Sequence, residues 1–152
     1  MQVVIKVDDK RIKAALKDAA LIKGPVATFL KKSAFTIEGR AKELAPVDTG
    51  RLRSGVQTKL GPFRAVVAAT VFYSPYVEFG TRPHFPPVEA LRGWARRHRQ
   101  NPWAVAMAIA KRGTRAQPFM RPGAEQSMPI IRGYLEEAAR EIESRFHRGI
   151  GS

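Results

Sequence analysis

The sequence has 152 residues, of which 44% are hydrophobic and 9% aromatic, so it can enclose one hydrophobic core and is neither disordered throughout nor long enough to favour a second domain. It contains no cysteine, which excludes disulfide bonds, thiolate metal sites and a cysteine nucleophile. The 27 Lys and Arg residues against 13 Asp and Glu give a formal charge of +14, which attracts an anionic partner such as nucleic acid, an acidic protein or an anionic membrane surface.

The first residues form no charged leader followed by an apolar stretch, and nowhere do about 18 apolar residues run together, as a membrane span requires. We therefore expect a soluble protein that is made in the cytoplasm and has no membrane partner. The length predicts a single domain over residues 1–152.

Apolar and polar residues alternate at the N-terminus, which predicts a short strand. Its apolar residues are Val3, Ile5 and Val7. Asp8 and Asp9 are good N-cap residues and predict a first helix after this strand. The buried stripe of that helix would be Ile12, Leu16 and Ala19.

Gly24 and Pro25 predict an interruption, with Pro25 in the first turn of a second, long helix. Apolar residues recur on one face of that helix at steps of three and four. They are Val26, Leu30, Ala34, Ile37, Ala41 and Leu44. A face of this kind must be buried, and a sheet is the simplest surface to cover it.

A turn over residues 45–50 ends the long helix, because the ring of Pro46 disfavours helical geometry in the residue before it. Residues 56–60 alternate in polarity and residues 65–73 are rich in β-branched and aromatic side chains. Together they predict an antiparallel hairpin. The second strand is apolar on both faces, so we place it at the centre of a small sheet.

Residues 74–87 contain four prolines, which predicts an ordered loop rather than a central strand. The next segments predict a helical pair: one helix over residues 88–99, with Leu91 and Trp94 inward, and another over residues 102–111.

A final helix with one apolar face follows the loop of residues 117–122. Its inward residues would be Ile131, Tyr134 or Leu135, Ala138 and Ile142. The expected fold is α+β: a small antiparallel sheet packed against a long N-terminal helix and a C-terminal helix, with a basic helical insertion at residues 87–113.

Basic residues are unevenly distributed. Residues 82–121 hold nine of them against Glu89 alone, so this segment carries +8 of the total +14. We predict that its helical part forms a surface facing DNA in a channel or an acidic partner, and such a surface binds phosphates without reading base sequence. The candidate residues are Arg92, Arg96, Arg97, Arg99, Lys111, Arg112 and Arg115.

Candidates for catalysis are few. The three His residues form no metal-binding motif. Asp48 and Glu78 are the only acids between residues 45 and 81, so a two-carboxylate metal nuclease would need this pair to meet. We favour structural roles: Asp48 as a cap or turn residue that accepts from backbone N–H groups, and Glu78 as the partner of an arginine. We therefore expect no enzyme, no cofactor and no metal.

Three segments, residues 45–54, 73–81 and 117–122, contain the motifs PVDTGRLRS, YVEFGT and QPFMRP in that order. Together they resemble the small tail-completion or head-tail connector (neck) proteins of long-tailed double-stranded-DNA bacteriophages and related prophage elements. With the flanking helices, the resemblance covers most of residues 20–145.

The resemblance implies a structural virion protein without catalytic residues that assembles between head and tail in a symmetric ring, commonly sixfold or twelvefold. The implied partners are other copies of the chain and neighbouring connector and tail proteins. Contact with double-stranded DNA in the channel, without sequence preference, is expected from the charge of the basic segment alone. A closed ring makes head-to-tail contacts through two different faces of each subunit. The alternative function is a free, basic, sequence-nonspecific nucleic-acid-binding protein whose Arg-rich helical pair binds DNA.

The matched motif positions are expected to hold turns and loops or to form interfaces. The first motif would fix the turn after the long helix, the second the loop after the central strand, and the third the start of the last helix. The positions are Asp48, Thr49, Gly50, Arg51, Tyr76, Glu78, Phe79, Gly80, Thr81, Pro118, Phe119, Arg121 and Pro122.

Overall fold

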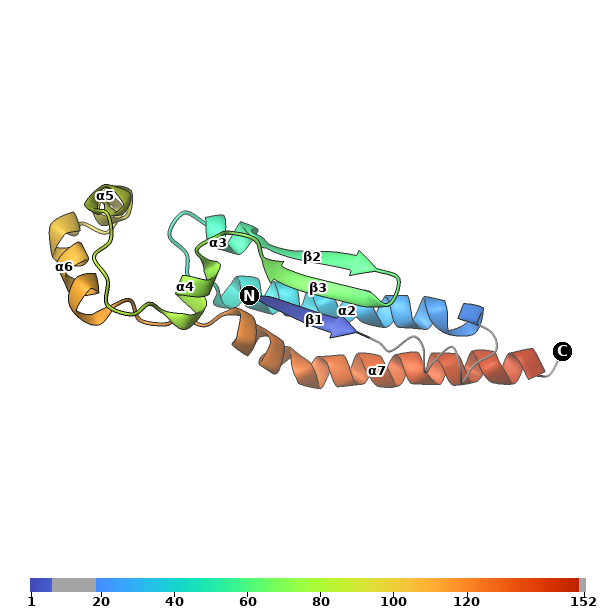
Figure 1. Ribbon diagram of the computed structural model, residues 1–152. Helices are drawn as coiled ribbons and strands as arrows, with labels where there is room; N and C mark the ends of the chain where they lie inside the picture. The colour runs from blue at the N-terminus through green and yellow to red at the C-terminus, as the bar shows by residue number, and fades with distance from the viewer. Residues whose placement is uncertain (7–18, 151–152) are drawn as a thin grey trace.

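The computed structural model describes residues 1–6 and 19–150, and within these it is an α+β fold, as predicted (Figure 1). Val7 of the predicted strand and the predicted helix after Asp8 and Asp9 lie outside the described residues, except for Ala19. The elements in chain order are β1 (Gln2–Lys6), α2 (Ala19–Leu44), α3 (Arg51–Ser54), β2 (Val56–Gly61), β3 (Arg64–Ala69), α4 (Ser74–Phe79), α5 (Val88–Arg97), α6 (Pro102–Arg112) and α7 (Met120–Ile150).

The sheet is antiparallel, with β3 between β1 and β2, so the predicted central strand is confirmed. Val3 of β1 and Thr58 of β2 both pair with Val67 of β3. Because side chains on paired positions share a face, Val67 and Ala65 of β3 are fully buried with Val3 and Ile5 packed beside them. This face of the sheet packs on α2.

The two long helices, α2 and α7, run side by side along the molecule (Figure 1). Five of the six apolar residues predicted to face inward from the long helix are buried in the core, and Leu44 packs against it. Burial of each larger side chain contributes about 1.5–3 kcal/mol, so the stripe accounts for much of the stability of the fold.

The predicted interruption at Gly24 and Pro25 is wrong, because α2 continues through both residues. Pro25 removes one backbone hydrogen bond from the helix and costs about 3 kcal/mol in a solvated helix interior. Here its ring is fully buried in the core, and the guanidinium of Arg145 from α7 covers Gly24. Tertiary packing therefore offsets a local signal that ends isolated helices.

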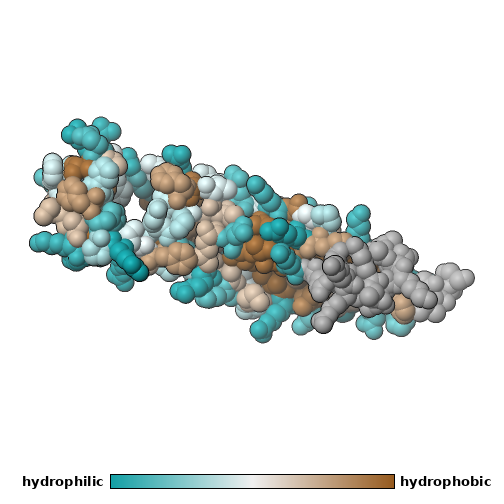
Figure 2. Space-filling view, viewed as in Figure 1, coloured by the Kyte–Doolittle hydropathy of each residue, from teal (hydrophilic) through white to brown (hydrophobic). Residues whose placement is uncertain are grey.

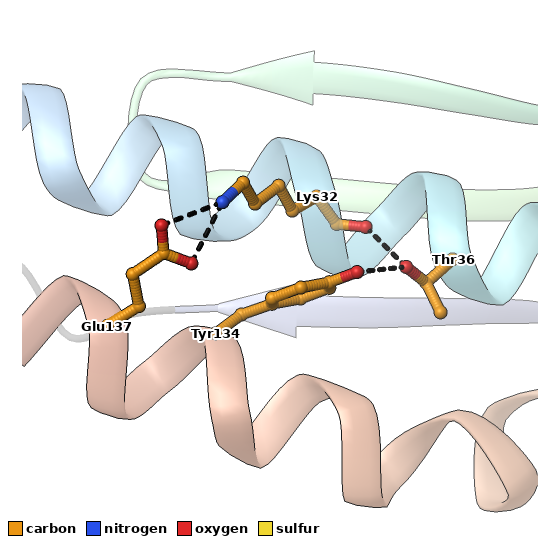
Figure 3. A network of polar contacts seen from close by, with 4 residues as sticks. All are labelled: Lys32, Thr36, Tyr134 and Glu137. Atoms are coloured by element: carbon orange, nitrogen blue, oxygen red, sulfur yellow. Dashed lines mark hydrogen bonds and ion pairs between the residues drawn. The ribbon is translucent and has the colours of Figure 1, made fainter.

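Polar contacts align α7 on α2 (Figure 3). The Thr36 hydroxyl donates to the Lys32 carbonyl at 2.9 Å and lies 3.4 Å from the Tyr134 hydroxyl, while Lys32 Nζ pairs with Glu137 at 2.8 Å. Of the two neighbouring candidates for the inner face of α7, Tyr134 packs on the core and Leu135 is exposed. Leu135 does not face inward because the polar tip of Tyr134 has a partner on α2.

Residues 74–79 form the short helix α4 instead of the predicted loop. Pro75 occupies the first turn of α4, where its fixed φ suits the helix and its missing N–H would be unpaired anyway. The strand before it ends at Ala69 rather than Tyr73. Thr70 N–H still donates to the Gly55 carbonyl at 2.8 Å, and the chain then turns, with the Ser74 N–H donating to the Val71 carbonyl at 3.0 Å.

The helical pair, α5 and α6, lies at one end of the molecule, beyond the sheet (Figure 1). The two helices pack through Ala95 and Ala106, which are buried. Asn101 caps α6 by accepting from the Trp103 N–H at 2.9 Å. Trp94 does not point inward as predicted: it is 38% exposed and stacks on His98 with ring centroids 4.3 Å apart. No helix in the described part of the chain is long and apolar enough to cross a membrane.

Candidate functional site

Glu78 joins the second and third sequence motifs. One carboxylate oxygen accepts from the N–H groups of Phe119 and Met120 at 2.8 and 2.9 Å, and the other from the N–H of Arg121 at 3.0 Å. These are donors at the start of α7 that have no acceptor within their own helix. Glu78 is only 3% exposed, so a side chain from α4 caps the last helix.

The predicted arginine partner of Glu78 is therefore wrong. A buried carboxylate at a helix N-terminus is stabilised by the N–H groups and by the helix dipole, and it needs no cation. The sequence holds a signal for this arrangement: residues 115–122 contain no Ser, Thr, Asp or Asn to cap α7 locally.

Two threonines close the base of the helical pair. Thr81 N–H donates to the Thr114 carbonyl at 3.1 Å, and Thr114 N–H donates to the Thr81 hydroxyl at 3.0 Å. Gly80 and Gly113 flank this bridge with φ of 72° and 70°. Residues of the second motif thus fix the segment that leads from α4 into the helical pair. Gly113 lies where the chain leaves the helical pair toward α7.

Asp48 ties the first motif to the end of α5. Its carboxylate accepts from Arg97 Nε at 2.9 Å, forms a second contact with Arg97 Nη2, and lies 3.1 Å from His98 Nε2. The predicted cap or turn role of Asp48 is wrong, since Gly50 precedes α3 and no side chain caps it. A bidentate guanidinium competes better for a carboxylate than scattered N–H groups do.

The ion pair of Asp48 predicts a pH dependence. The hydrogen bond from Arg97, helped by His98, lowers the pKa of Asp48 from 3.8 to about 2. Because the pKa is lower in the folded than in the unfolded chain, the stabilisation is complete above about pH 4 and is lost as the pH falls through 2. We expect Asp48→Asn to be less stable than the wild type at pH 7 and to match it near pH 2 in urea unfolding. Parallel stability curves at all pH values would contradict this role.

The predicted basic surface is divided by the structure. Arg97 is held by Asp48, and Arg92 pairs with Glu89 at 2.7 Å. The other candidate cations of this basic surface form no ion pair with a described residue: Arg96, Arg99, Lys111, Arg112 and Arg115. Arg96 and Arg99 are three residues apart at the end of α5, and Arg99 adopts a φ of 53° as the chain turns toward α6.

Exposed aromatic side chains gather around α4 and the helical pair. Among the motif residues, Tyr76 and Phe79 are 58% and 64% exposed, whereas Phe119 is fully buried. Three further aromatic side chains are exposed that the sequence pattern did not single out: Phe72, Phe85 and Trp103. Figure 2 shows apolar side chains at the surface of this end of the molecule, among hydrophilic ones.

A groove of about 770 Å³ lies between α4 and the helical pair. Tyr76 and Val77 of α4 line one part of it, and Leu91 of α5 and Ile109 of α6 line another. Asp48 and Glu78 are not in its lining, and their carboxylates are engaged by Arg97 and by the start of α7 respectively. The described residues contain no group of three His, Asp or Glu that could hold a metal ion.

The comparisons with known proteins concern the first half of the chain. Residues 10–80 match the model of the HK97-gp10-like family, described as "Bacteriophage HK97-gp10, putative tail-component". The match includes α2, the hairpin and the first motif, and it ends at Gly80 of the second motif. No curated protein and no solved structure matches the chain. Residues 10–80 are thus similar to a family of phage tail components, and the predicted resemblance to phage head-tail and tail proteins is confirmed.

Proposed function

We propose that this phage tail component is a subunit of the head-tail neck, in a connector, tail-completion or tail-terminator ring around the DNA channel. In this proposal it is a structural virion protein and not an enzyme, and it is assembled in the cytoplasm of the host. The proposed ring is sixfold or twelvefold and contacts neighbouring connector and tail proteins. We also propose that residues 1–152 form one domain, with residues 87–113 as an insertion.

The observation that carries the proposal is the chemistry of the protruding end of the molecule. Arginines that form no ion pair with a described residue and exposed aromatic side chains lie on or beside the same helical pair. Aromatic side chains are the residues most enriched in protein interfaces, and unpaired arginines attract phosphates. A ring subunit needs both properties: faces that bind its neighbours and a surface that faces DNA.

The high positive charge of the chain opposes ring formation by copies of the chain alone. Each subunit carries a formal charge of +14, so copies repel one another until salt, DNA or an acidic neighbour screens them. We therefore expect a discrete ring with an open centre at moderate salt, alone or with the adjoining neck protein. Native mass and electron-microscope class averages measure this. A chain that stays monomeric in both conditions and binds duplex DNA tightly would support the alternative, a free nucleic-acid-binding protein.

The DNA contact is tested with a double variant, Arg96→Ala and Arg99→Ala. Arg97 is left intact because it holds Asp48. Surface changes of this kind alter stability by less than about 0.5 kcal/mol, so folding and ring formation should persist. The slope of the logarithm of the DNA-binding constant against the logarithm of the salt concentration should become shallower by about two per subunit. Particles should also retain less DNA. The control is Lys59→Ala with Arg64→Ala, two exposed cations of the sheet; an equal loss in the control would contradict the assignment.

A further inference from the structure

The groove between α4 and the helical pair is apolar over most of its lining. Its side chains include Tyr76 and Val77 from α4 and Leu91 and Ile109 from the helical pair, with prolines of residues 83–87 between them. Its volume of about 770 Å³ lies within the range of about 300–1,000 Å³ typical of sites for small ligands. The groove therefore has room for a few side chains of a partner and not for a folded domain.

The rim of the groove exposes large aromatic side chains to solvent. Phe72 is 81% exposed and packs edge-on against Tyr73, with ring centroids 5.4 Å apart. Tyr76, one turn into α4, is also more than half exposed. Contiguous apolar surface of this kind marks a binding site in soluble proteins.

The charged side chains in the lining are cations. Arg82 lies in the loop that leads into the helical pair, and Arg115 lies in the loop that leaves it. The lining contains no Asp or Glu. Neither arginine forms an ion pair with a described residue, whereas Arg92 and Arg97 nearby each have a carboxylate. Unpaired guanidinium groups beside an apolar floor favour a ligand that brings its own carboxylates.

The groove is distinct from the basic surface assigned to DNA. Four other cations on or beside the helical pair that form no ion pair within the described part of the chain do not line the groove: Arg96, Arg99, Lys111 and Arg112. Duplex DNA would need a dense row of cations and gains little from an apolar, proline-rich floor. A protein segment uses both features of the groove, because apolar side chains fill the floor and carboxylates reach the arginines.

We propose that this groove binds a short apolar segment of a neighbouring virion protein that carries one or two carboxylates, held by Arg82 and Arg115. The inference deepens the proposed function and rests on it, since the partner is taken to be an adjoining component of the particle. It gives the subunit one docking site of stated chemistry, separate from its DNA-facing surface.

The test uses the full chain and a yeast-displayed library of random peptides of about 15 residues. Peptides are selected on the wild type and then measured against the double variant Arg82→Glu with Arg115→Glu. We expect the enriched peptides to combine apolar anchors with Asp or Glu and to bind the variant about tenfold or more weakly. Replacing their acidic residues by Lys should restore binding to the variant, because the charges are then exchanged.

The matched control is Arg96→Glu with Arg99→Glu, which changes the net charge equally outside the groove. An equal loss of binding in this control would show general attraction to a basic protein and overturn the proposal. So would a selection that enriches no peptide, or one that enriches peptides without acidic residues.

A second pair of variants tests the apolar part of the groove. Phe72→Ser should weaken peptide binding about tenfold, whereas Phe35→Ser, an exposed aromatic of α2 outside the groove, should not. If Phe72→Ser instead weakens the binding of a single-stranded oligothymidine, the groove is a nucleic-acid site and the proposal is wrong. Peptide binding is measured on the subunit and ring formation on the assembly. A negative result for the groove can therefore be told apart from a negative result for the proposed ring.

Discussion

Glu78→Ala is expected to destabilise the protein by about 3 kcal/mol or more, because it leaves three N–H groups at the start of α7 without an acceptor. The side chain is almost fully buried, so water cannot easily replace the carboxylate. Urea unfolding measures the change, and the thermal midpoint should fall by roughly 10 °C.

Two further variants refine this result. Glu78→Gln keeps one carbonyl oxygen but turns an amide NH₂ toward an N–H donor, so we expect about half the loss. Glu125→Ala is the control, because Glu125 is an exposed acid of α7 with only a 4.0 Å contact to Arg121. Its effect should stay below about 0.5 kcal/mol. If Glu78→Ala were no more disruptive than Glu125→Ala, Glu78 would not be the cap of α7.

The cap gives the second and third sequence motifs a physical meaning. Glu78 and Phe119 are 41 positions apart. The segment between them consists of the helical pair and the two loops that connect it to α4 and α7. Glu78 fixes the point where that segment rejoins the core, and the bridge between Thr81 and Thr114 fixes its base. The motif residues thus hold the helical pair in place on the body, while Tyr76 and Phe79 stay available for contacts.

The sequence was a good guide wherever burial follows a simple period. The central position of β3 followed from its two apolar faces, and the core stripe of α2 from apolar residues at steps of three and four. Such patterns report the environment of one element at a time. They could not show that Pro25 would be buried deeply enough for α2 to continue through it.

The candidate site was predicted only in part, because its contacts depend on tertiary structure. Asp48 and Glu78 stood out as isolated acids, but their partners lie far along the chain, at Arg97 and at residues 119–121. Composition does not show which arginine a carboxylate meets, or that it meets backbone N–H groups instead. Exposure of an aromatic side chain is equally hidden, as Trp94 shows by lying on the surface of a short amphipathic helix.

Gly113→Ala is expected to open the base of the helical pair. Gly113 has a φ of 70°, and a Cβ there would lie 1.9 Å from the Thr81 carbonyl oxygen, so the backbone itself must move. The strained conformation alone costs about 1–3 kcal/mol for a residue with a side chain, and the clash adds to it. We expect the Thr81 and Thr114 amides to lose protection from hydrogen exchange about tenfold or more, since both donate in the bridge.

The matched control is Gly133→Ala in α7, where an added Cβ meets nothing within 4 Å. In a helix interior this change should stabilise the protein by about 0.5–1 kcal/mol. The same substitution is thus expected to raise the free energy of unfolding at Gly133, where a Cβ meets no other atom, and to lower it at Gly113, where a Cβ clashes with a carbonyl. If Gly113→Ala left the exchange of Thr114 unchanged, the bridge would not depend on this glycine. If exchange rises while ring formation is lost, the placement of the helical pair on the body is what assembly requires.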